Sequence, residues 1–214
     1  MITSRAIFWA VDVQVDFMKP EGRLYVPGAE HLIPNIGRLI GAVRESKVFL
    51  ISSADAHKAD DREFQEWPPH CMKGTPGAEL LPEACAHPRL IIPNRENFVF
   101  PATLDTYRQV NIEKNTLDVF DNPNTDLLLK RLEDLPSRSY VANPLFVVFG
   151  VATDYCVRCT AEGLLKRERP LAIVQDAVRA IDEKKGRIIL DNLQSRGAQL
   201  VTTEDALGRF KSSS

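Results

Sequence analysis

Short apolar segments rich in β-branched and aromatic residues recur along the chain, with amphipathic segments between them. Because these runs are uninterrupted rather than alternating, they are typical of parallel strands covered by helices on both faces. This pattern limits the chain to an α/β fold more than any other feature does. We expect buried strands at 6–13, 48–55, 145–152 and 171–177, a short last one at 198–203, and another at 89–93 or 110–114.

Helical periodicity occupies the segments between these strands. Apolar residues, Leu127 and Ile188 among them, form one stripe in each of 31–45, 124–135 and 182–195. Strand–helix–strand repetition favours right-handed crossovers between parallel strands. The sequence therefore predicts a doubly wound, mostly parallel sheet of roughly six strands with helices on both faces.

Composition indicates the class of protein. The 214 residues fit a single domain, 1–214, with a polar tail at 211–214. The proline-rich stretch 56–115 is expected to form loops over the sheet. The net charge of -2 argues against a nucleic-acid or membrane-surface partner. The absence of a signal-peptide pattern and the four cysteines predict a cytoplasmic protein with reduced thiols.

Ligands of open parallel sheets bind beyond the carboxyl ends of the strands, so polar residues there are candidates for function. Asp12 lies inside the apolar run VDVQV, where a carboxylate is costly unless it has a partner. We expect a functional carboxylate at Asp12, whereas Asp16 fits an ordinary turn or cap.

A second group of candidates follows the second expected strand. Asp55 and His57 are two residues apart, so in an extended segment they point the same way. Glu63 could add an oxygen donor, and His70 a second imidazole. A carboxylate with two imidazoles suits zinc, manganese or iron. The competing interpretation is a set of solvated loop residues.

The segment GVATDYCVRC follows the strand at 145–152. Thr153 or Asp154 can cap a helix there, which would place Cys156 in the first turn. Unpaired N–H groups and the helix dipole favour a thiolate at that position, as in a nucleophile elbow with sulfur in place of oxygen. Cys156 and Cys159 also form a C-x-x-C pair, so a dithiol redox role is the alternative.

A nucleophilic thiol needs a base or a cation nearby. No histidine follows His87, which leaves an upstream histidine or a lysine–aspartate pair. Lys114 is the only lysine between Lys73 and Lys130, and it ends the possible strand 110–114. A solvated surface lysine is the competing interpretation.

Four motifs occur in order: VDVQVDF at 11–17, ADAH at 54–57, WPPHCMKGTPGAEL at 67–80 and GVATDYCV at 150–157. Together they resemble the nicotinamidases (pyrazinamidases) of the isochorismatase-like cysteine hydrolase superfamily. The resemblance implies that superfamily's fold and the hydrolysis of nicotinamide to nicotinate and ammonia through a thioester, in NAD salvage. The alternative is a related cysteine hydrolase acting on another small amide or ureide.

The resemblance also implies catalytic roles. Cys156 would be the nucleophile, Asp12 the proton acceptor and later donor, and Lys114 the cation beside both. The backbone amides of Ala152 and Cys156 would form an oxyanion hole, with a cis peptide bond between Val151 and Ala152.

The implied cofactor is one divalent metal ion, zinc or alternatively iron or manganese, bound by Asp55, His57 and His70. Many relatives carry a histidine six residues after the first aspartate, where this chain has Asp61. Others use a glutamate seven residues before the P-P-H histidine, and here that residue is Glu63. We take Glu63 as the fourth ligand and hold Asp61 in reserve.

The substrate pocket implied by the resemblance has Phe17 and Trp67 as aromatic walls, with Val151 and Tyr155 beside them. The stretch 88–113 is longer than the usual link and contains no family motif. It could form a lid or a subunit contact, and a homo-oligomer remains open.

Overall fold

The computed structural model describes residues 6–45, 48–133 and 143–211. Within them, seven strands form one parallel sheet in the order β3-β4-β2-β1-β5-β6-β7. The strands are β1 (Ala6–Val11), β2 (Phe49–Asp55), β3 (Arg89–Ile92), β4 (Gln109–Lys114), β5 (Leu145–Val151), β6 (Leu171–Arg179) and β7 (Gln199–Val201). The predicted α/β class is confirmed. The sheet has one strand more than expected because both alternative segments, β3 and β4, form strands.

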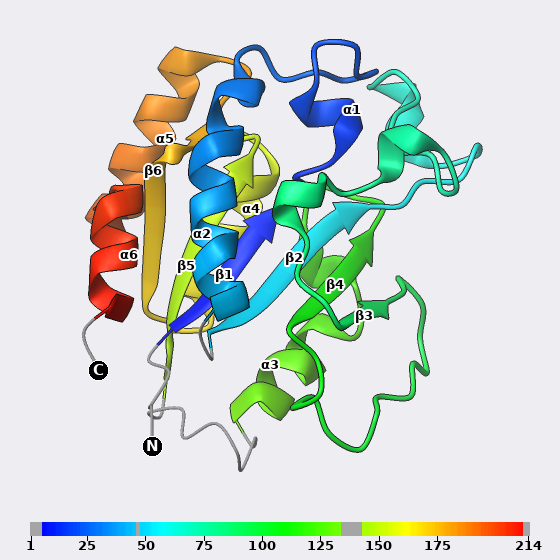
Figure 1. Ribbon diagram of the computed structural model, residues 1–214. Helices are drawn as coiled ribbons and strands as arrows, with labels where there is room; N and C mark the ends of the chain where they lie inside the picture. The colour runs from blue at the N-terminus through cyan, green and yellow to red at the C-terminus, as the bar shows by residue number, and fades with distance from the viewer. Residues whose placement is uncertain (1–5, 46–47, 134–142, 212–214) are drawn as a thin grey trace.

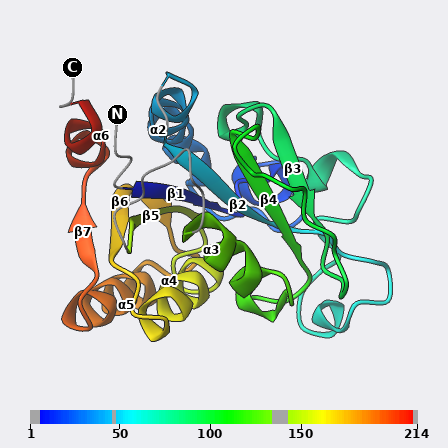
Figure 2. The same cartoon turned by 90° about the horizontal axis from the view of Figure 1, so that it is seen from below.

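Helices cover both faces of the sheet. They are α1 (Val15–Met18), α2 (Ile33–Glu45), α3 (Thr125–Glu133), α4 (Cys156–Lys166), α5 (Glu183–Ser195) and α6 (Thr203–Lys211). Figure 2 shows α2 and α6 on one face of the sheet and α3, α4 and α5 on the other. None of the helices in the described part of the chain is both long and apolar enough to cross a membrane.

The central strands form because their side chains are apolar on both faces. Every residue of β1 and β2 is buried, as expected for strands between two helical layers. On α2 the predicted stripe is buried through Ile36, Leu39, Ile40 and Val43.

Two residues of the expected helical stripes do not reach the core. Leu127 on α3 is 44% exposed and Ile188 on α5 is 67% exposed. Each has a neighbour that takes the inward position, because adjacent helical residues are turned by about 100°. Leu128 is fully buried, and Ile189 packs against the core. The expected end of the helix at 124–135 and most of the 211–214 tail lie outside the described residues.

The stretch 56–115 is not made of loops alone, since it contributes β3 and β4 at one end of the sheet. Short 3-10 turns occur at Arg62–Gln65, Pro76–Ala78 and Pro82–Ala84. Its first part lies beyond the ends of the central strands (Figure 1), and a single bridge pairs His57 with Met72. The stretch therefore brings loop residues to the edge of the sheet where the strands end.

A close contact between two central strands also lies at this edge. Gly150 in β5 pairs with Val11 in β1 and has φ 120. A Cβ atom at Gly150 would lie 2.0 Å from the Val11 carbonyl oxygen. Glycine is therefore required for β1 and β5 to approach as they do.

Candidate active site

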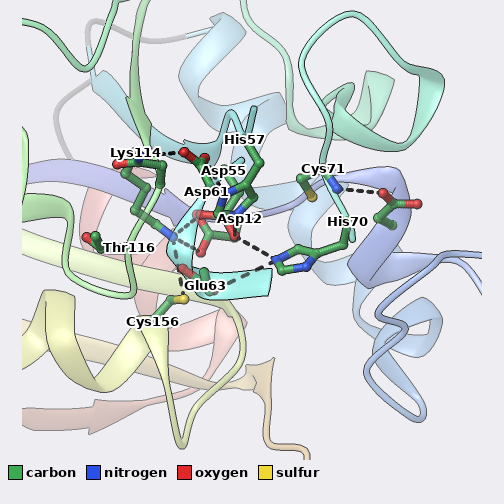
Figure 3. Close-up of polar contacts among 12 residues, drawn as sticks. Asp12, Asp55, His57, Asp61, Glu63, His70, Cys71, Lys114, Thr116 and Cys156 are labelled. Carbon is green, nitrogen blue, oxygen red and sulfur yellow. Dashed lines mark hydrogen bonds and ion pairs between the residues drawn. The ribbon is translucent and has the colours of Figure 1, made fainter. Parts of the chain in front are cut away.

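Four adjacent strands carry the candidate catalytic residues to one edge of the sheet. Asp55 and Lys114 end β2 and β4, Asp12 follows β1, and Cys156 begins α4 after β5. In the strand order β4-β2-β1-β5 these are consecutive neighbours. The structure thus brings together residues far apart in the sequence, and Figure 3 shows Lys114 pointing toward the other three.

Lys114 is the centre of this group and is 1% exposed. Its Nζ lies 2.9 Å from Asp12 Oδ2 and 3.5 Å from Cys156 Sγ. The same ammonium donates to Asp55 Oδ1. A buried cation is tolerable only when it is paired in this way, so Lys114 is not a solvated surface lysine.

Burial and charge act in opposite directions on these groups. Burial alone would lower the pKa of Lys114, but Asp12 and Asp55 raise it well above its ordinary value. Burial raises the pKa of Asp12 despite the lysine beside it. It also raises the pKa of Cys156, although Lys114 opposes that shift. The lysine therefore stays charged, while Asp12 and Cys156 are suited to exchanging a proton.

The Asp12 backbone is held in an uncommon conformation. Its φ of 50 lies in the left-handed region, which non-glycine residues seldom adopt. Its N–H donates to the Ser53 carbonyl at 3.1 Å, which attaches it to β2. This turn carries the carboxylate to the end of Lys114.

The beginning of α4 differs from expectation in its capping. Cys156 does lie in the first turn, but the residue before it, Tyr155, makes no side-chain cap. The Asp154 carboxylate instead accepts hydrogen bonds from the Ile181 and Asp182 N–H groups, both at 3.0 Å. The predicted cap by Thr153 or Asp154 is therefore wrong, because Asp154 holds the turn before α5.

Two backbone amides close to the thiol are available to a ligand. The Val151–Ala152 peptide bond is cis, as the resemblance implied. No group within the described ranges accepts a hydrogen bond from the N–H of Ala152 or of Cys156. These two N–H groups are the candidates for binding an oxyanion.

Asp55, His57, Glu63 and His70 form a cluster suited to a metal ion. One ligand atom of each lies within 4.8 Å of the others. Nε2 of His57 and Nε2 of His70 are buried without a hydrogen-bond partner in the described structure. They lie 3.6 and 3.5 Å from Asp55 Oδ2. Two orphaned imidazole nitrogens facing carboxylates fit a divalent cation, and this donor set suits zinc, iron or manganese.

The two carboxylates at this cluster differ in their surroundings. Burial acts to raise the pKa of Asp55, but Lys114 and the imidazoles hold it below its usual range. Burial raises the pKa of Glu63, with the negative Asp55 adding to the shift. Asp61 lies outside the cluster and contacts His57 at its other ring nitrogen, Nδ1, at 3.0 Å. The structure thus places Glu63, and not Asp61, in this candidate cluster.

A pocket opens over the thiol and the candidate metal-binding cluster. The four predicted pocket residues all line it, and Trp67 and Tyr155 meet edge to face with ring centroids 5.2 Å apart. The complete lining is Asp12, Phe17, Leu24, Val26, Asp55, Glu63, Trp67, His70, Leu117, Val151, Ala152, Tyr155, Cys156 and Ile181. Apart from the carboxylates, His70 and the thiol, it is apolar or aromatic. Cys159 does not line it, and all four cysteines are free.

Sequence reasoning missed Gln14, which joins three parts of the site. Its side chain accepts from the Asp55 N–H and donates to the Asp55 carbonyl, both at 2.8 Å. It also donates to the Ala78 carbonyl at 2.9 Å. The available signal was its position in the apolar run VDVQV, three residues after the end of β1, since a buried amide must find partners.

Asp16 performs the structural task expected of it, but over a longer range. Its carboxylate accepts from the N–H of Cys71 at 2.7 Å and of Arg23 at 3.1 Å. A Cβ atom at Gly77 would lie 2.2 Å from this carboxylate. Asp16 therefore holds the segment after His70 against α1.

The isochorismatase domain family matches residues 6–205. The chain belongs to this family. It is 26% identical over 197 residues to the nicotinamidase/pyrazinamidase of Mycobacterium tuberculosis, covering 89% of this chain and 95% of that protein. It is 25% identical over 217 residues to the nicotinamidase of Escherichia coli, covering 91% and 93%.

A solved pyrazinamidase structure has the same fold. The pyrazinamidase of Pyrococcus horikoshii, in complex with zinc, superimposes with a TM-score of 0.71 at 26% identity, covering 92% of this chain and 99% of that one. The comparisons confirm the predicted resemblance to nicotinamidases and identify the chain as an amidohydrolase.

Proposed function

We propose that this isochorismatase-family enzyme hydrolyses nicotinamide to nicotinate and ammonia. The observation that carries the proposal is the buried Cys156–Lys114–Asp12 group at the floor of a pocket with aromatic walls. The relatives' names support the same substrate. Lys114 lies behind Asp12 and Cys156 and is paired with Asp12 and Asp55, and no other lysine and no arginine lies at the pocket within the described residues. Such a lining favours a neutral aromatic amide over an anionic substrate.

The first half of the reaction forms a thioester. As the Cys156 sulfur attacks the amide carbon, its proton moves to the Asp12 carboxylate, and Lys114 stabilises the negative charge on both groups. The carbonyl oxygen becomes an oxyanion that accepts from the N–H groups of Ala152 and Cys156. Each such donor is typically worth about 3 kcal/mol in the transition state. The C–N bond then breaks, and ammonia leaves with the proton from Asp12.

The second half regenerates the thiol. Asp12, again a carboxylate, takes a proton from water as the water oxygen attacks the thioester carbon. The same two N–H groups bind the second oxyanion. When the C–S bond breaks, the sulfur leaves with the proton held by Asp12, and nicotinate is released. Water has thereby supplied one oxygen and one hydrogen to the acid and one hydrogen to ammonia.

We further propose that Asp55, His57, Glu63 and His70 hold one divalent ion. When bound, such an ion supplies a Lewis acid that can fix and polarise the pyridine end of the substrate. Phe17 and Trp67 would then confine the ring between aromatic faces, with its carboxamide toward Cys156. Positioning of this kind accounts for a large part of catalysis when the attacking atom is already close.

The experiment is to measure ammonia release from nicotinamide, pyrazinamide, an aliphatic amide and a ureide by purified variants. Cys156→Ala should lose at least about 10³-fold in kcat, because the thioester cannot form. Lys114→Met should also lose orders of magnitude, and the double variant should lose no more than Cys156→Ala alone. Cys159→Ala is the matched control and should stay active.

Mass spectrometry of the quenched reaction should show a nicotinoyl adduct on the wild-type protein and none on Cys156→Ala. Faster turnover of the aliphatic amide or the ureide than of nicotinamide would reject the substrate assignment. Loss of activity in Cys159→Ala would instead favour the alternative in which Cys156 and Cys159 act as a redox dithiol.

A further inference from the structure

A row of hydrogen-bonded polar side chains connects the proposed metal site to the stretch 88–113. His57 Nδ1 lies 3.0 Å from Asp61 Oδ2. Asn115 Nδ2 donates to Asp61 Oδ1 at 3.3 Å, and Asn94 Nδ2 donates to Asn115 Oδ1 at 2.7 Å. The Lys58 N–H also donates to Asp61 Oδ2, at 3.0 Å. Both oxygens of Asp61 are thus held by groups from two segments of the chain, 57–58 and Asn115, and Asn94 on a third segment holds Asn115.

The contact with Asp61 fixes which ring nitrogen of His57 can bind a cation. A carboxylate only accepts hydrogen bonds, so the proton of the neutral imidazole lies on Nδ1. Nε2 then carries the free lone pair, and it is this atom that faces the cluster without a partner among the described residues. The ring is also packed against Phe64, with centroids 4.9 Å apart.

The second histidine of the cluster is oriented by a different kind of acceptor. Nδ1 of His70 lies 2.8 Å from the Pro68 carbonyl oxygen, a backbone group that no substitution removes. His57 depends instead on a side chain. The orientation of His57 can therefore be tested by mutation without changing any member of the proposed ligand set.

We propose that Asp61 is a positioning residue that sets the tautomer and ring orientation of His57 for metal binding, and that Asn115 and Asn94 hold Asp61 in place. This inference rests on the proposed metal site. It gives the stretch 88–113 a role, since Asn94 follows β3 and Asn115 follows β4. Asn122 ties these two strand ends together, donating to the Glu113 carbonyl at 2.8 Å and the Pro93 carbonyl at 3.3 Å.

The test is zinc affinity, measured by competition with a chromophoric chelator. Removing an outer carboxylate partner of a metal-bound histidine typically weakens binding about 10–100-fold, and we expect a loss in this range for Asp61→Ala. Asp60→Asn is the matched control, because Asp60 is an exposed acid in the same loop. It should bind zinc as the wild type does. Asn115→Ala should lose less than Asp61→Ala, and the double variant should match Asp61→Ala.

A second measurement distinguishes positioning from general destabilisation. The visible absorption spectrum of the cobalt-loaded protein should change in Asp61→Ala and return toward the wild type in Asp61→Asn, whose amide oxygen can still accept from Nδ1. Circular dichroism of the metal-free proteins should be alike. If Asp61→Ala fails to fold, Asp61→Asn and Asn115→Ala supply the same comparison.

Zinc affinity of Asp61→Ala within twofold of the wild type would overturn the inference, as would an equal loss in Asp60→Asn. A wild-type protein that binds no zinc, iron or manganese would contradict the metal site itself, and this inference with it. Intact zinc binding with no nicotinamide hydrolysis would reject the substrate assignment and leave the role of Asp61 standing.

Discussion

At the scale of single residues, the proton acceptor determines how activity depends on pH. Burial raises the pKa of Asp12 above the ordinary value of 3.8 for an aspartate. In the proposed mechanism the carboxylate form accepts the thiol proton, so activity should be lost as the pH falls through this raised pKa. Lys114 has a pKa well above 10.5 and should remain charged throughout the neutral range. We predict that kcat/KM for nicotinamide falls on the acid side with a midpoint above pH 3.8.

The measurement is a pH profile of kcat/KM beside a profile of Cys156 alkylation by iodoacetamide. Both should show the same acid limb, because both require Asp12 to take the thiol proton. Asp126→Asn removes a surface carboxylate that pairs with Arg167 and should leave the limb unchanged. If the alkylation rate did not change over the pH range in which kcat/KM falls, the loss of activity at acid pH would be due to another group.

The sequence motifs identified most of the residues of the candidate site but not which of these residues are in contact. The spacing of Asp55, His57 and His70 indicated one cluster, and the structure contains that cluster. The lone-lysine argument left Lys114 open, since only the neighbouring order of β4, β2 and β1 brings it to Asp12. Strand order is a long-range property that local patterns do not specify.

At the scale of elements, the contact between β1 and β5 depends on one glycine. Gly150→Ala would place its Cβ atom 2.0 Å from the Val11 carbonyl oxygen, in a backbone conformation with φ 120. Neither strand can shift cheaply, because each pairs with another strand on its far side. We predict a loss of at least about 2 kcal/mol in the free energy of unfolding, measured by denaturant titration.

Gly37→Ala is the control for this substitution. Gly37 lies in α2, and a Cβ atom there would meet nothing within 4 Å. Alanine in a helix interior is favoured over glycine by up to about 1 kcal/mol, so this variant should be as stable as the wild type or more so. Equal stability of Gly150→Ala and Gly37→Ala would show that β1 and β5 can separate without cost.

The elements themselves followed from local patterns where the chain is strongly periodic, as in α2 and the central strands. Local patterns predicted less well those elements whose formation depends on contacts with a distant segment of the chain. The choice between 89–93 and 110–114 could not be made locally, because an edge strand and its inner neighbour form together. The cap before α4 was also wrong, since Asp154 reaches a distant turn that no short-range rule includes.

At the scale of the whole molecule, a bound metal should stabilise the fold. The cluster joins the end of β2 to the loop that carries Glu63 and His70, so an ion bound there as proposed would favour the folded chain. Free zinc at 100 times its dissociation constant adds about 2.7 kcal/mol. We predict that excess chelator lowers the Tm of the metal-loaded wild type and leaves that of His70→Ala unchanged.

Calorimetry with and without chelator measures this difference. His31→Ala is the matched control, since the His31 side chain is 79% exposed and lies outside the cluster. It should respond to chelator as the wild type does. A chelator effect of the same size in His70→Ala would locate the stabilising ion elsewhere.

The position of β1 between β2 and β5 also has a consequence for synthesis on the ribosome. A growing chain can pair β1 with β2 early, but the other edge of β1 stays open until β5, which begins at Leu145, has emerged. An open edge of an apolar strand invites pairing with other chains. Cys156, the proposed nucleophile, emerges only after β5. An unfinished chain that lacks this strand cannot hold the thiol next to Asp12, so under the proposed mechanism hydrolysis can begin only once both edges of β1 are closed.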